Sequence, residues 1–138
     1  MKRIGWIALG VGIAFGAGWL AGSSGRSAAE VTAGRAEVRA EFLEARALIL
    51  QGRIRVFELN FGDAAQQFEA AGHVVERLQT RLRETGLAER AGLLEVALSY
   101  LREAGAQAAA LDPGAQGTAG DALRTLERVG GPPSAAQR

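Results

Sequence analysis

The residues that could do chemistry in this chain are one histidine, a set of helical carboxylates and one serine. The chain holds a single histidine, His73, and no cysteine, so a metal site could draw on few ligand types. Helix-bundle metal sites use a Glu-x-x-His motif, whereas here Glu76 follows His73. The other candidate carboxylates are Glu41, Glu44, Glu69, Glu95 and Glu103. We expect no metal site, and we interpret His73 as a partly exposed bystander and the carboxylates as structural charge.

Two further kinds of chemistry lack their usual signals. Ser99 has no histidine that the sequence places as a base, and no glycine-rich phosphate loop occurs outside the apolar N-terminal segment. Residues 27–138 hold 13 arginines against 15 acidic residues, so this part is slightly acidic and lacks the one-sided basic field that nucleic acids require. The sequence therefore predicts a protein that is not an enzyme, takes no cofactor and binds no nucleic acid.

The N-terminal segment Ile4–Gly22 has the length and composition of a membrane span. It contains about 19 uncharged residues, which as a helix would extend roughly 28 Å, close to the thickness of a hydrocarbon core. Trp6 and Trp19 lie near its two ends, where indole rings favour the membrane interface, and Lys2 and Arg3 can lie among lipid phosphates. We expect residues 1–22 to be a transmembrane signal-anchor in a lipid bilayer.

A cleaved signal peptide is the alternative to a retained anchor. Cleavage after Ser23, with Ala21 three positions from the cut, is sterically possible, but the apolar run is longer than signal peptides usually have. A short basic N-terminus favours the cytoplasmic side. A single lysine among 16 basic residues, with much alanine and glycine, is typical of a GC-rich bacterial genome. We expect a single-pass protein of the bacterial inner membrane whose body faces the periplasm.

Small residues recur along the expected span. Such a row lets another helix approach closely within the bilayer, although small residues are also common in membrane helices generally. The main row and a second pair are Gly10, Ala14, Gly18 and Gly22, with Gly12 and Gly16. They predict a packing face for another membrane protein or for a second copy of the chain.

The remainder of the chain predicts an all-α domain. We expect a flexible linker over 23–29, a helical domain over 30–129 and a disordered tail over 130–138. Within the domain we expect helices at 30–59, from Asp63 to Thr85–Gly86, at 87–111 and at 119–129. The first should end at Asn60–Phe61–Gly62, because asparagine and glycine tolerate the left-handed closing conformation. The fold expected is one transmembrane helix plus a three- or four-helix antiparallel bundle or a helical hairpin stack.

Two of these helices carry more apolar residues than one buried stripe requires. The first has an inward stripe of Val38, Phe42, Ala45, Ile49, Gly52, Val56 and Leu59. Its second stripe consists of Leu43, Ala47, Leu50, Ile54, Phe57 and Phe61. The third helix adds Leu93, Val96 and Tyr100. A fourth helix or the linker could cover such faces, but we expect contact with another protein through Leu50, Ile54, Phe57 and Tyr100.

The first hairpin resembles a tetratricopeptide repeat, a unit of two antiparallel helices with small and aromatic residues at fixed offsets. The matching residues are Leu48, Gly52, Phe61, Ala64, Phe68 and Ala71. Arg55 stands where an aromatic residue is usual, and the closing proline is missing. The resemblance covers one unit of the chain well, and it implies a protein-binding concave surface in an array that normally needs about three units.

Together these features predict a membrane-anchored, non-catalytic helical adaptor that binds a protein partner at a bacterial membrane. A structural accessory subunit of a larger membrane complex is the first alternative. The second is a secreted, soluble helical binding protein, which would arise if the N-terminal segment were cleaved.

Overall fold

The computed structural model describes residues 32–130, and these residues form four α-helices and no strand. A first helix occupies 32–57 and is followed by α2 (Phe61–Glu84), α3 (Ala88–Ala109) and α4 (Ala115–Gly130). The chain divides into two units between Ala36 and Glu37, and the bundle described below belongs to the second. The prediction of an all-α helical bundle is confirmed.

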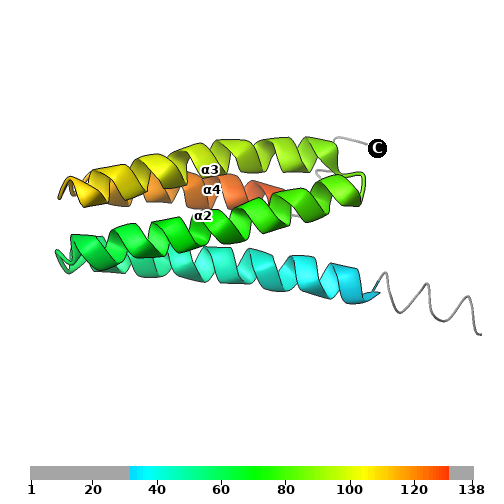
Figure 1. Cartoon of the computed structure of the whole chain (residues 1–138), viewed down its shortest axis with the longest axis horizontal. Helices are drawn as coiled ribbons and strands as arrows, with labels where there is room; N and C mark the ends of the chain where they lie inside the picture. The colour runs from blue at the N-terminus through cyan, green and yellow to red at the C-terminus, as the bar shows by residue number, and fades with distance from the viewer. Residues whose placement is uncertain (1–31, 131–138) are drawn as a thin grey trace, which may run out of the picture. The chain divides into compact units, whose positions relative to one another are not determined.

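Successive helices of the bundle run in opposite directions (Figure 1). The turns at 57–61 and 109–115 lie at one end, and the turn at 84–88 lies at the other. α3 packs against both α2 and α4. The first helix meets α2 where Gly52 faces Phe68, and it meets α4 where Phe42 faces Gly130. Each helix therefore has two neighbours, which closes the bundle.

The core is formed by the stripes that the helical period predicts. In α2 six positions spaced three and four residues apart are buried, because residues at that spacing share one face of a helix. These positions are Ala64, Phe68, Ala71, Val75, Leu78 and Leu82. One buried polar group links two helices, since the Gln79 side chain donates to the Ala91 carbonyl oxygen at 3.0 Å.

The turn after the first helix differs from the one expected. Leu59, at φ 60°, takes the left-handed conformation, Asn60 caps α2, and Gly62 lies inside that helix. The chain closes the same way after α3, where Leu111 has φ 59°. The backbone N–H of the residue after each leucine bonds a carbonyl five residues back, at 2.8 Å for Asn60 and 2.9 Å for Asp112. These bonds hold both leucines where glycine is usual.

The fourth helix begins at Ala115, four residues earlier than expected, so the predicted loop is helical. Asp112 Oδ1 accepts from the Gly114 backbone N–H at 2.7 Å, and Pro113 precedes the first turn, where a missing N–H is harmless. Ala115 and Ala119 are fully buried. Their packing carries the helix through a glycine-rich stretch that has low intrinsic helix propensity.

Smaller corrections concern positions near helix ends. Leu59, expected to point inward, is exposed because it occupies the left-handed turn. Residue 87, expected to begin the third helix, is the exposed Leu87 that caps α3. Gly130, assigned to the tail, is the last residue of α4. The predicted anchor over 1–22, the linker over 23–29 and the tail beyond residue 130 lie outside the described residues. The resemblance to a tetratricopeptide repeat stays a prediction.

Candidate interaction surface

One flank of the first helix exposes large apolar side chains. Phe57 is 80% exposed, Ile54 56% and Leu43 49%, while Leu50 is partly buried against the core. At 100° per residue, Phe57, Leu50, Leu43 and Ile54 lie about 20°, 40°, 60° and 80° round the helix from Arg46. The second stripe is therefore largely uncovered within the bundle, and three of the residues predicted for protein contact, Leu50, Ile54 and Phe57, lie on it.

Three arginines border this stripe on the side that faces α4. Arg39, Arg46 and Arg53 follow one another every seven residues, so they form a row along the helix. Arg46 pairs with Glu127 of α4 at 3.3 Å. Arg53 lies over Gly120 of α4, with its Cζ atom 3.8 Å from where a Cβ on that glycine would stand. We call this row and the apolar stripe beside it the first-helix flank.

The predicted contact residues of α3 lie on the other side of α4. Leu93 and Val96 are exposed and Tyr100 is partly buried against the core. With Asp121, Arg124, Thr125 and Arg128 of α4 they line a shallow hollow of about 190 Å³. The α3 residues and the first-helix flank thus border the same helix. We call the surface made of α4 and these two borders the α4 face.

An ion-pair network holds the first helix to α2 on the opposite side of that helix. Arg81 pairs with Glu37, and its Nη2 atom lies 3.1 Å from Glu41 Oε1. Arg77 lies 3.5 Å from Glu44. The hydrogen bond that Arg81 donates to the Glu41 carboxylate is the main cause that raises the pKa of Arg81 above its usual value. The Glu41 side chain is mostly buried. Its ion pair, together with those of Glu37 and Glu44, links the first helix to α2.

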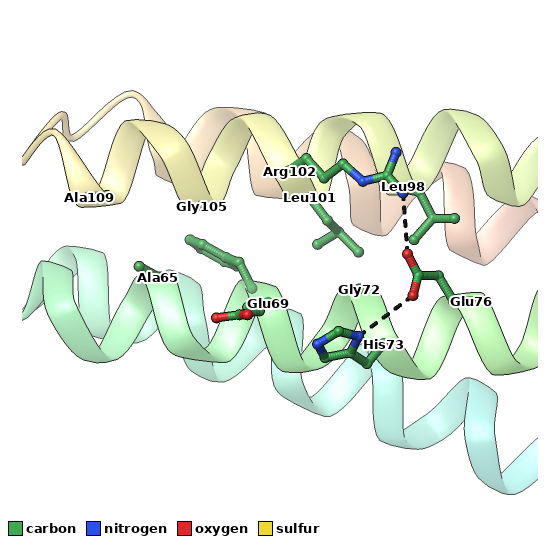
Figure 2. A pocket seen from close by; sticks show the side chains of 11 residues that line it. Ala65, Glu69, Gly72, His73, Glu76, Leu98, Leu101, Arg102, Gly105 and Ala109 are labelled. Carbon is green, nitrogen blue, oxygen red and sulfur yellow. Dashed lines mark hydrogen bonds and ion pairs between the residues drawn. The ribbon is translucent and has the colours of Figure 1, made fainter.

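The single histidine borders a groove between α2 and α3 (Figure 2). The groove has a volume of about 400 Å³, an apolar floor of Phe68, Leu98 and Leu101, and small residues along its edges. The His73 side chain is 66% exposed, with Nδ1 3.6 Å from Glu76 Oε2. Arg102 of α3 reaches the other oxygen of Glu76 at 3.2 Å. The Glu76 carboxylate thus joins the two helices at one end of the groove.

Metal-ligand clusters and membrane-spanning helices are both absent from the part of the chain that the structure describes. Within residues 32–130 no group of three or more His, Asp or Glu side chains could hold a metal ion. None of the helices in the same range is long and apolar enough to cross a membrane. The predicted span, with its interface residues Lys2, Arg3, Trp6 and Trp19 and its small-residue row, lies outside that range.

Comparison of the chain with protein-family models, curated proteins and solved structures found no match. A binding role for this chain is therefore inferred from the chemistry of its surface.

The sequence indicated the apolar part of this surface but not its charge. Leu50, Ile54, Phe57 and Tyr100 were identified from surplus apolar positions. The row of Arg39, Arg46 and Arg53 was missed, although its seven-residue spacing is visible in the sequence. Arg53 lies close to Gly120 because α4 packs beside the first helix. The spacing of residues within one helix does not show which helices are neighbours.

Proposed function

We propose that this chain is a non-catalytic helical adaptor that is anchored in a bacterial inner membrane by Ile4–Gly22 and binds a protein partner through the α4 face. The observation that carries the proposal is the pair of exposed apolar borders on either side of α4. Soluble monomers rarely expose contiguous apolar patches without a binding role. Aromatic residues such as Phe57 and Tyr100 are also enriched where protein interfaces are most strongly bound.

The proposed location follows from the N-terminal sequence. A linker over 23–29 would separate the bundle from the bilayer, with the bundle in the periplasm. Because the chain has no cysteine, single cysteines can report topology. We expect a cysteine at Gln66 to react with a membrane-impermeant maleimide added outside the inner membrane. Reaction only after the membrane is opened would contradict this orientation.

Site-specific photo-crosslinking in native membranes tests the interaction surface. A benzoylphenylalanine at position 57 and another at position 100 should give the same discrete adduct, because the two positions border one surface. Gln66, exposed on α2, is the matched control position and should give none. Equal adducts from all three positions, or none from 57 and 100, would remove the α4 face as a binding surface.

Purification in mild detergent separates the adaptor from an accessory subunit. A subunit would co-purify in fixed stoichiometry with one complex, whereas an adaptor would also leave a stable free pool. Comparison of the full chain with residues 27–138 then locates recognition. Loss of every partner from the shorter form would place recognition in the membrane span, not in the bundle.

A further inference from the structure

The α4 face carries a surplus of positive charge although the bundle as a whole is acidic. Residues 37–130 contain 11 arginines and 14 acidic residues. The first-helix flank and α4 together hold five arginines and two acidic residues, namely Arg39, Arg46, Arg53, Arg124 and Arg128, with Asp121 and Glu127. Arg39, Arg53 and Arg128 have no ion pair among the described residues, whereas Asp121 and Glu127 are each paired. The unpaired charge on this surface is therefore positive.

Two of these arginines converge on one point. Arg53 Nη2 and Arg124 Nη1 each lie 3.9 Å from the position that a Cβ on Gly120 would occupy. Arg53 Nε is buried and has no acceptor among the described residues. Like charges this close repel each other, and a buried donor without an acceptor is costly. A carboxylate beside the two guanidinium groups would offset their repulsion by accepting hydrogen bonds from both.

The apolar residues beside the arginines recur at the spacing expected for a surface that packs lengthwise against another helix. Leu43, Leu50 and Phe57 recur every seven residues, as do Arg39, Arg46 and Arg53. A second helix that packs along the first would meet both series in register, since helices that pack lengthwise share a seven-residue repeat. From Leu43 to Phe57 the stripe extends about 21 Å at 1.5 Å per residue.

We propose that the partner presents an acidic amphipathic α-helix to the α4 face. Its leucine-type residues pack on Leu43, Leu50, Ile54 and Phe57, and its carboxylates, one per heptad, meet the arginine row. One carboxylate binds beside the guanidinium groups of Arg53 and Arg124. The inference rests on the proposed function and adds the chemical class of the partner. The paired series favour a helix over a flat anionic lipid surface, which has no seven-residue repeat.

Designed peptides test the partner class with the full-length chain in phosphatidylcholine nanodiscs. The probe is a labelled three-heptad helix with a leucine seam and glutamates on both sides of the seam. The matched control peptide has lysines in place of the glutamates. Fluorescence anisotropy should show at least about ten-fold tighter binding of the glutamate peptide at about 50 mM salt, and a smaller difference at about 300 mM. Equal binding of the two peptides would overturn the acidic partner.

Arginine variants test which residues are responsible. Arg39→Gln, Arg46→Gln and Arg53→Gln together should weaken binding of the glutamate peptide by about ten-fold and reduce its salt dependence. The control triple, Arg83→Gln, Arg90→Gln and Arg102→Gln, removes the same charge from α2 and α3 and should leave binding unchanged. Equal losses in the two triples would overturn the assignment to the α4 face.

An apolar variant separates this inference from the proposed function. Ile54→Ser with Phe57→Ser should abolish binding of the glutamate peptide. If this variant loses the crosslinked native partner while the arginine triple keeps it, the adaptor function stands and the acidic helix is wrong. Loss of the partner in neither variant contradicts the proposed function itself.

A fluorophore in the apolar stripe tests whether a lipid surface or a second copy of the chain binds there in place of an acidic helix. Ala47→Cys places a single label in the apolar stripe, and Gln66→Cys on α2 is its control. The emission maximum of the label at position 47 should shift to shorter wavelength when the glutamate peptide is added and not otherwise. A shift caused by phosphatidylglycerol in the nanodisc, or by a second copy of the chain, would replace the proposed partner with a lipid surface or with self-association.

Discussion

The contact between Gly52 and Phe68 gives the sharpest test of how the first hairpin packs. A Cβ added to Gly52 would stand 2.8 Å from Phe68 Cδ1 and still closer to Cε1. Real Cβ atoms do not approach other atoms so closely, and the Phe68 ring is fully buried, so it has little room to move. We therefore expect Gly52→Ala to destabilise the bundle although alanine is the better helix former.

The magnitude is the balance of two terms. Alanine in place of glycine in a helix interior contributes about 1 kcal/mol. Forcing one more carbon into a packed core costs about 1–3 kcal/mol. The net loss for Gly52→Ala should be about 0–2 kcal/mol in the free energy of unfolding. Gly72→Ala is the matched control, because a Cβ there meets nothing within 4 Å, and it should instead gain about 0.5–1 kcal/mol.

Urea unfolding of the full-length chain in nonionic micelles, followed by circular dichroism, measures both variants. The decisive comparison repeats Gly52→Ala in a Phe68→Leu background, where the ring atoms that would clash are gone. There the substitution should change sign and gain about 0.5–1 kcal/mol. If Gly52→Ala stabilises the unaltered chain as much as Gly72→Ala does, the two helices do not pack as described.

Three further predictions concern the turns, the exposed stripe and the ion-pair network. Gly86→Ala should lose about 1 kcal/mol in urea unfolding, because Gly86 has φ 77° and a Cβ there is strained; an unchanged midpoint would contradict that turn. Phe57→Ser should change stability by less than about 0.5 kcal/mol, whereas Leu94→Ala should cost about 2–5 kcal/mol; similar losses would contradict the exposure of Phe57. Arg81→Gln should lower the melting temperature more than Arg83→Gln, and by the same amount at pH of about 6 and 9. Because the pKa of Arg81 is raised above the ordinary value of arginine, its stabilisation is complete across this pH range and is lost only in far more alkaline solution.

Helical periodicity accounts for the part of the fold that the sequence predicted well. Burial at every third or fourth position shows directly in the order of residues, so six buried positions of α2 from Ala64 to Leu82 follow from the sequence. Val74 and Gln79, which are also buried, lie outside that stripe. Turns were harder, because their geometry depends on backbone bonds to the preceding helix. Leu59 and Leu111 hold left-handed conformations that the residue type does not favour. The start of α4 was missed for a similar reason, since tertiary packing outweighs the low propensity of its glycines.

The candidate surface, like the fold, could be predicted from the sequence only in part. Surplus apolar positions such as Ile54 and Phe57 can be counted from the sequence, because each bundle helix needs only one buried stripe. The convergence of Arg53 and Arg124 on Gly120 joins residues about 70 positions apart in the sequence. Helical spacing within one helix cannot predict such a contact, since it depends on which helices are neighbours and on their register.

The geometry of the closed bundle explains why the second stripe of the first helix is uncovered among the described residues. The first helix already has α2 on one side and α4 on the other, and its first stripe fills the space between them. Ile54 lies about 140° from the buried Ile49 at 100° per residue, beyond the reach of either neighbour. No other helix exists among residues 32–130 to cover it. A fifth helix, supplied from elsewhere, would complete the packing, and the arginines beside the stripe favour one that carries acidic residues.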